Sequence, residues 1–266
     1  MVNMVETRVG EVAYSDAGKG PVVVLLHAAL HDRRDFDTIA SRLCRDHRVI
    51  ALDWPGHGDS PAPNHPPTAA SFADVLADVV ATLDLPPTAF VGNSVGGFAA
   101  ARLAITDPQR VSRLVLVDTG GFLANPLTNL YCRTLGMPAV LKRVLPRFVR
   151  SYMKATSDSD YAIEERVLAR ANTWDGVVLA AALWRSFATP AYDLRPHVDR
   201  ITAPCLVIWG SKDTAIPVRF GRSTAAAIPG ARLEVLPTGH VPFSSDPEGF
   251  LRIAAPFLAA ASGSRQ

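Results

Sequence analysis

The chain has 266 residues, of which 48% are hydrophobic and 20% charged, a balance typical of a folded globular protein and not of a disordered chain. Its 27 basic and 25 acidic residues leave a net charge of +2. The chain contains no long basic tract, so its charge does not indicate a nucleic-acid partner. At roughly 100 to 200 residues per domain, the length predicts one large domain or one domain that carries an insertion.

Three widely spaced cysteines, Cys44, Cys132 and Cys205, form no CxxC pattern. An odd and scattered set fits neither a disulfide framework nor a zinc cage, so we expect reduced thiols and a cytoplasmic location. The first ten residues lack the basic and apolar regions of a signal peptide. The apolar run at 21–30 is about half as long as a membrane span, so we expect no span.

Short β-rich segments alternate with helical ones along the chain. The first two have no helix between them and predict a hairpin. The middle ones, such as PVVVLLH and CLVIWG, are continuous apolar runs, typical of strands buried on both faces of a parallel sheet. Eight strands are predicted, at 5–10, 11–18, 21–27, 48–53, 88–93, 113–118, 205–210 and 231–237.

Helices are predicted between most of these strands, which makes the fold an α/β architecture with helices on both faces of the sheet. The alternation of strands and helices stops after the strand at 113–118, because 122–202 has helical periodicity and no strand pattern. We therefore expect a core domain made of 1–121 and 203–266, and an inserted helical lid at 122–202. The core helices are expected at 34–45, 68–83, 95–106, 219–227 and 247–260, and the lid helices at 137–155, 158–172 and 175–189.

The segment Gly92-Asn93-Ser94-Val95-Gly96 lies where a predicted strand meets a predicted helix. This is the pattern of a nucleophile elbow, in which glycines allow two backbone segments to approach and the serine is exposed on a tight turn. A backbone N–H at Val95, on the helix N-terminus, would face an oxyanion. We predict Ser94 as a nucleophile.

A serine hydroxyl needs a base, usually a histidine that a carboxylate orients. Asp213 follows the strand CLVIWG and His240 follows ARLEVLP, so both fall in loops at strand C-termini, where ligand sites lie in open α/β sheets. We predict His240 as the base and Asp213 as the acid. Asp118, at the end of LVLVD, is the alternative acid.

Five segments in order, LLHAAL, DWPGHGDS, VGNSVGG, WGSKDTAIP and GHVPFSSDPEGF, resemble motifs of the α/β-hydrolase superfamily over nearly the whole chain. The resemblance implies a mostly parallel eight-stranded sheet with helices on both faces and an inserted helical lid. It also implies that His27 supports the oxyanion loop, that His57 braces the DWPGHGDS turn, and that the backbone N–H of Ala29 is the second oxyanion donor. The chain departs from the family pattern at Ala28, where most relatives have glycine, and the path of this loop depends on φ there.

The predicted lid contains six basic residues and no acidic one between Thr119 and Ser157. This stretch is either a solvated helix face or a patch for an anionic substrate or a membrane surface. The aromatic and aliphatic side chains of the lid are sufficient to roof a pocket for a hydrophobic group. The candidate substrate-binding residues are Asn93, Leu30, Trp184 and Val241. No nucleotide motif and no metal-ligand spacing is present, so we expect no cofactor and no metal.

The leading functional prediction is a serine hydrolase that cleaves a carboxylic ester or lactone, with a small, hydrophobic molecule as substrate. Asn93 before Ser94 resembles the C–C bond hydrolases of ring-cleavage diketones, which makes that activity the alternative. A cofactor-free haloperoxidase-like activity and a non-catalytic receptor remain further alternatives. Dehalogenases and epoxide hydrolases of this fold have aspartate where Ser94 stands. The sequence does not decide the oligomeric state.

Overall fold

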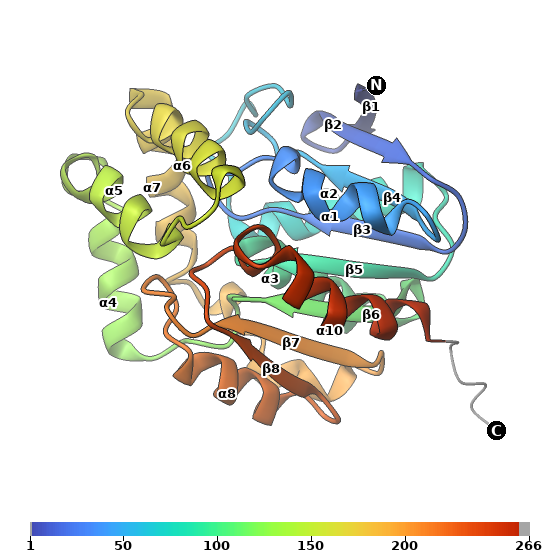
Figure 1. Ribbon diagram of the computed structural model, residues 1–266. Coiled ribbons are helices and arrows are strands. Elements are labelled where there is room, and N and C mark those ends of the chain that lie inside the picture. Colours follow the sequence, from blue (N-terminus) through green and yellow to red (C-terminus); the bar gives the residue numbers. More distant parts are fainter. Residues whose placement is uncertain (1, 261–266) are drawn as a thin grey trace.

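The computed structural model describes residues 2–260. Within these residues eight strands form one sheet in the order β1-β2-β4-β3-β5-β6-β7-β8 (Figure 1). The pairs of β2 with β1 and with β4 are antiparallel, and the pairs from β4 to β8 are all parallel. The strands are β1 (Val2–Thr7), β2 (Gly10–Ala17), β3 (Val22–Leu26), β4 (Arg48–Leu52), β5 (Thr88–Asn93), β6 (Val111–Val117), β7 (Cys205–Gly210) and β8 (Arg232–Leu236).

The central strands are the apolar runs that the sequence indicates. Every residue of β3, β5 and β7 is buried, because helices cover both faces of a parallel sheet. The predicted eight strands and the initial hairpin are confirmed. The first strand lies three residues earlier than predicted, since the turn to β2 ends at Gly10, whose φ of 110° suits glycine.

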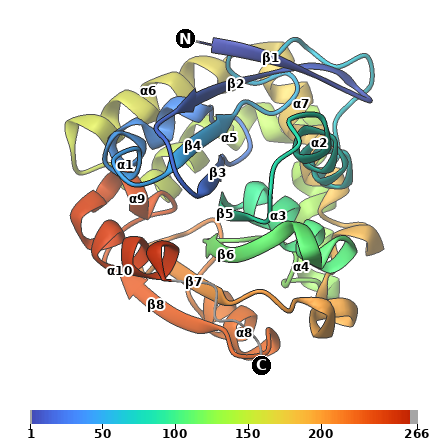
Figure 2. The same cartoon turned by 90° about the vertical axis from the view of Figure 1, so that its right-hand side faces the viewer.

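Helices cover both faces of the sheet (Figure 2). On one side lie α1 (Asp37–Leu43) and α10 (Pro247–Ala259), and on the other α2 (Ala69–Thr82) and α3 (Val95–Thr106). The helices α8 (Arg219–Ala227) and α9 (Pro242–Ser245) follow β7 and β8. The helix predicted from residue 34 begins as a 3₁₀ turn at Arg33–Phe36. The Asp32 side chain caps this turn by accepting from the Arg34 N–H at 2.9 Å.

Between β6 and β7 the chain forms a helical segment. Its helices lie together at one end of the strands, at the left of Figure 1. One of its four helices, at 126–135, is not among the helices that periodicity predicts. Asn125 accepts hydrogen bonds from the N–H groups of Leu127 (3.1 Å) and Thr128 (3.0 Å), and Pro126 takes the first helical position. An Asn-Pro pair is a helix-start signature that could have revealed it. The helices are α4 (Pro126–Leu135), α5 (Pro138–Met153), α6 (Asp158–Ala171) and α7 (Trp174–Ser186).

Large aromatic side chains fill the core on both sides of the sheet. Trp54 and Phe72 stack with ring centroids 4.8 Å apart, and Phe36 packs against Phe243 at 4.4 Å. Burial of such rings is a main source of folding free energy. The three cysteines are free thiols. No helix within residues 2–260 is both long and apolar enough to cross a membrane.

Candidate active site

Ser94 occupies a strained turn between β5 and α3. Its backbone has φ 55° and ψ −115°, a conformation that L residues adopt only where the surrounding structure imposes it. The Ser94 N–H donates to the carbonyl oxygen of Val117 on β6 at 3.0 Å, and its own carbonyl accepts from Phe98 at 3.1 Å. These bonds hold the serine at the end of the sheet, where its side chain lines a cavity.

The two glycines around Ser94 are required by close backbone contacts. A Cβ on Gly92 would lie 2.5 Å from the carbonyl oxygen of Gly96. A Cβ on Gly96 would collide with the carbonyl oxygen of Leu26 on β3. Strand, turn and helix can therefore approach closely enough for a tight elbow only when both positions lack a side chain.

His240 and Asp213 form a buried hydrogen-bonded pair. The His240 Nδ1 lies 2.7 Å from the Asp213 Oδ2. The other oxygen of Asp213 accepts from the N–H groups of Ala215 at 2.7 Å and Ile216 at 3.1 Å. The two oxygens of Asp213 thus accept three hydrogen bonds, the arrangement that suits an ionised carboxylate.

The backbone of His240 is also fixed from both sides. Its N–H donates to the carbonyl oxygen of Tyr152 at 3.0 Å, and its carbonyl accepts from the Asn93 Nδ2 at 3.0 Å. The ring of Tyr152 contacts the imidazole edge-on, with centroids 5.3 Å apart. The residue beside the elbow serine and a residue of α5 thus both determine where the imidazole lies.

Asp118, the alternative acid, is a close neighbour of this pair. Ligand atoms of Asp118, Asp213 and His240 all lie within 4.8 Å of one another. Asp118 is fully buried, and one of its oxygens accepts from the Gly210 N–H at 2.9 Å. Burial, and next the negative charge of Asp213, raise the pKa of the Asp118 carboxyl well above its usual range. Both effects favour the protonated form of the Asp118 carboxyl.

The loop after β3 is held by two buried histidines. The Leu30 N–H donates to His57 Nε2 at 3.0 Å, and the Trp54 N–H donates to His27 Nε2 at 3.0 Å. Each ring places its Nδ1 against a backbone carbonyl, so both are neutral and donate through Nδ1. Burial lowers the pKa of both rings. The positive φ in this loop falls on Leu30, at 70°, and not on Ala28, so alanine fits where relatives carry glycine.

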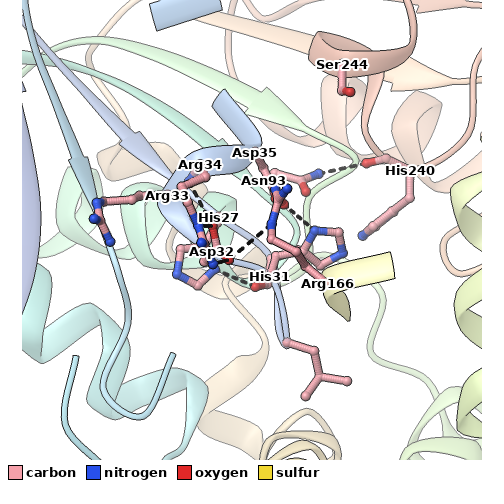
Figure 3. Close-up of polar contacts among 12 residues, drawn as sticks. His27, His31, Asp32, Arg33, Arg34, Asp35, Asn93, Arg166, His240 and Ser244 are labelled. Carbon is pink, nitrogen blue, oxygen red and sulfur yellow. Dashed lines mark hydrogen bonds and ion pairs between the residues drawn. The ribbon is translucent and has the colours of Figure 1, made fainter. Parts of the chain in front are cut away.

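A second buried polar cluster joins the strand ends to the helical segment (Figure 3). His31 hydrogen-bonds to Asp35 through Nδ1 and lies 3.1 Å from the Tyr152 hydroxyl through Nε2. Arg166 on α6 pairs with Asp35 at 2.9 Å and with Asp32 at 3.5 Å. Sequence reasoning missed this cluster, because its members come from separate segments and only His31 and Asp35 show a recognisable spacing.

The cavity beside Ser94 measures about 360 Å³ and is mainly apolar. Leu30 and Trp184, which were predicted to bind substrate, line it together with His240 and Ala29, the predicted oxyanion donor. Asn93 and Val241 are fully buried and lie outside this lining. The prediction that they contact substrate does not fit the structure, because the Asn93 amide is already bonded to the carbonyls of Val117 and His240. Val95 begins α3 and is also buried.

Comparisons with known proteins agree with the fold. The family model described as the alpha/beta hydrolase family matches residues 23–253. A 2-hydroxy-6-oxononadienedioate/2-hydroxy-6-oxononatrienedioate hydrolase of Cupriavidus pinatubonensis is 32% identical over 80% of this chain and 76% of its own. A pimeloyl-[acyl-carrier protein] methyl ester esterase of Neisseria meningitidis is 31% identical over 89% of this chain and 93% of its own.

Solved structures give the same result. The crystal structure of the enol-lactonase from Burkholderia xenovorans superposes with a TM-score of 0.79, at 27% identity, over 97% of this chain and all of that one. The chain belongs to the alpha/beta hydrolase family. The predicted superfamily and the predicted fold class are thereby confirmed. The relatives differ in the bond they cleave, so the family fixes hydrolase chemistry and leaves the substrate to be argued from the site.

Proposed function

We propose that the protein is a serine hydrolase that cleaves a small, hydrophobic carboxylic ester or lactone. The observation that carries this proposal is the strained Ser94 elbow, which opens into the same cavity as a buried, carboxylate-paired His240. In this arrangement Ser94 is the nucleophile, His240 the base and Asp213 the orienting acid. The helical segment 122–202 acts as the lid over the core.

The reaction proceeds by two acyl transfers. Ser94 Oγ attacks the carbonyl carbon while His240 Nε2 takes the hydroxyl proton, and the N–H groups of Val95 and Ala29 stabilise the oxyanion. The tetrahedral intermediate collapses as His240 returns the proton to the leaving alcohol. A water molecule then attacks the acyl-enzyme, with His240 as base again, and the carboxylic acid is released with free Ser94.

Each supporting group matches a demand of this cycle. Asp213 stabilises the imidazolium that forms at His240 when the serine is deprotonated. The His57 ring holds Leu30 at its positive φ, which keeps the neighbouring Ala29 N–H on the path of the loop around Ser94. The raised pKa of Asp118 disfavours a second negative charge beside Asp213. The site therefore pairs one carboxylate with one imidazole.

The apolar wall of the cavity supports a hydrophobic acyl or alkoxy group. Trp184 contacts the rings of Tyr131, Phe148 and Phe187 at 5.5–5.7 Å between centroids, and all four line the cavity. Aromatic walls of this kind bind apolar groups by burial and contribute no charge. A neutral ester or lactone suits them better than a substrate with two carboxylates.

C–C bond hydrolysis is the second candidate. It is supported by the 32% identity to the Cupriavidus hydrolase and by Asn93 before Ser94. Such a substrate carries carboxylates, whereas Arg219 is the sole basic side chain besides His240 among the described residues that line the cavity. A dienoate substrate distinguishes the two candidates, because its turnover requires cleavage of a C–C bond and can be followed by the loss of its conjugated chromophore.

The experiment that tests the proposal is hydrolysis of p-nitrophenyl esters of increasing acyl length, from acetate to dodecanoate, with Ser94→Ala as the blank. We expect turnover with a defined optimum of acyl length, and loss of kcat by several orders of magnitude in the variant. A fluorophosphonate probe should label the wild type and not Ser94→Ala. Equal turnover by both proteins would refute Ser94 as nucleophile, and labelling without ester turnover would favour the C–C substrate.

A further inference from the structure

The outer side of α5 carries a stripe of cations. Arg143, Arg147 and Arg150 follow one another at helical spacings of four and three residues, and Lys154 comes directly after the helix. All four are exposed. Within the described part of the chain, Arg150 is the only one of them with an ion pair, to Glu164 at 4.0 Å. The segment from 119 to 157 contains no acidic residue to neutralise them.

The neighbouring helix α4 exposes apolar side chains. Leu127 is 79% exposed, Leu130 62% and Tyr131 46%, and their spacing of three and four residues places them on one face. Seven of the ten large hydrophobic residues that are exposed within residues 2–260 belong to the helical segment. Exposed apolar side chains gathered on one region mark an interaction surface, whereas single ones scattered over a protein do not.

This apolar face is continuous with the mouth of the active-site cavity. Leu127 and Tyr131 are exposed to solvent and also line the cavity beside Ser94. The helices α4 and α5 lie together at the outer edge of the molecule, beyond the strand ends (Figure 1). Exposed apolar side chains of α4 therefore border the route by which an apolar substrate enters, and the cations lie on the neighbouring helix α5.

From these observations we infer that α4 and α5 form a docking surface for an anionic lipid–water interface. Lipid headgroups neutralise the α5 cations, and the acyl region receives the α4 leucines. A hydrophobic ester dissolved in the same lipid layer passes between Leu127 and Tyr131 into the cavity. Delivery of substrate rests on the proposed function, but binding to the surface does not.

The charge pattern favours a lipid layer over other occupants. Two copies of the chain that met through this face on a two-fold axis would place one cation stripe against the other. An acidic protein would neutralise the cations but would not provide the apolar phase that holds both the leucines and a hydrophobic substrate. An anionic lipid layer provides the charge and the apolar phase together.

Cosedimentation with vesicles tests the surface. Vesicles of phosphatidylglycerol and phosphatidylcholine in equal parts are compared with vesicles of phosphatidylcholine alone, using the Ser94→Ala protein so that no substrate is consumed. We expect binding to the anionic vesicles, weakened by salt, and little binding to the neutral ones. One cation near an anionic surface changes the partition coefficient roughly fivefold. The triple variant Arg143→Gln, Arg147→Gln, Lys154→Gln should therefore bind roughly a hundredfold more weakly.

A matched triple variant controls for net charge. Arg45, Arg222 and Arg252 are exposed, lie outside the helical segment and have no ion pair within residues 2–260. Their replacement by glutamine changes the net charge equally and should leave vesicle binding within about threefold of the parent. Leu130→Ser tests the apolar part, because it should remove the binding that persists at high salt. Leu130 does not line the cavity, so this variant should hydrolyse a soluble ester normally.

Three outcomes would overturn the inference. The first is equal binding to neutral and anionic vesicles. The second is an equal loss of binding in both triple variants, which would reflect overall charge. The third is binding to soluble polyglutamate without binding to anionic vesicles, which would indicate a polyanionic protein partner. The proposed function is judged separately, by turnover of p-nitrophenyl acetate in solution without vesicles.

Discussion

The cavity is built from two regions that hold their side chains in different ways. On the strand-end side, Asp213 and His240 are fixed by hydrogen bonds to the backbone as well as to each other. On the helical side, Trp184 is held by ring contacts with its neighbours. Hydrogen bonds are directional and define an orientation, whereas ring packing tolerates changes of shape. We therefore expect substitutions in the first region to affect the rate of chemistry and those in the second to affect the choice of substrate.

Among the substitutions that compare these two regions, the largest effect is expected at Asp213. Asp213→Asn keeps the shape of the side chain but removes the charge that stabilises the imidazolium and disturbs the tautomer of His240. The expected loss in kcat is about 10³–10⁴-fold, measured with the best p-nitrophenyl ester. A loss of less than tenfold would mean that His240 does not depend on Asp213.

A smaller effect, of another kind, is expected on the helical side. Trp184→Ala removes part of the apolar wall and leaves fewer contacts for a long acyl chain. The KM for the longest accepted ester should therefore rise about tenfold, as loss of one large side chain predicts. For p-nitrophenyl acetate kcat should stay unchanged. Trp174→Ala is the matched control, because Trp174 lies on the same helix, is 57% exposed and does not line the cavity. A uniform loss of kcat on all esters would contradict the division between the two regions.

A substitution at Asp118 tests whether the strand-end region depends on the charge of this side chain or on its shape. Because burial and the charge of Asp213 raise the pKa of Asp118 and favour its protonated form, Asp118→Asn substitutes a neutral group of similar shape for that form. The kcat of the variant should remain within about threefold of the wild-type value. The pH at which kcat/KM is half-maximal should shift by no more than a few tenths of a pH unit. A loss as severe as that of Asp213→Asn would identify Asp118 as the working acid.

The smallest expected effect concerns stability and pH. Burial lowers the pKa of His57 in the folded state, so below the unfolded value of about 6.5 the unfolded chain binds a proton that the folded chain excludes. The stability associated with this group is present above that pH and is lost as the pH falls. The melting temperature should therefore decrease between pH 7.5 and 5, and less steeply for His57→Gln, which cannot titrate. Parallel slopes for the two proteins would contradict this.

Much of the fold was predictable because its signals are local. Strands β3, β5 and β7 are apolar runs between turn residues, and α3 has the predicted bounds. The helix α4 was missed because its face is largely exposed apolar surface, which gives little contrast between a buried and a solvated side. Periodicity measures that contrast, whereas the Asn125-Pro126 cap is a separate signal.

The site was predictable in part. Candidates for nucleophile, base and acid followed from their positions after strands, since the C-terminal ends of parallel strands meet at one edge of the sheet. The environment of Asn93 could not be predicted, because its amide bonds to carbonyls more than twenty residues away. The same applies to the contact of Asp118 with Asp213, which raises the pKa of Asp118 only when β6 and β7 are adjacent.

The sequence by itself determined the order of the elements, the elbow and the residues available for chemistry, because turn conformations and apolar periodicity depend on neighbours along the chain. Only the tertiary structure decided which histidines support the backbone, which carboxyl has a raised pKa and which side chains reach the cavity. Burial and electrostatic interaction depend on distance in space, and the groups concerned lie far apart in sequence. The Tyr152 of α5 meets His31 and His240 in this way, through contacts that span more than eighty residues.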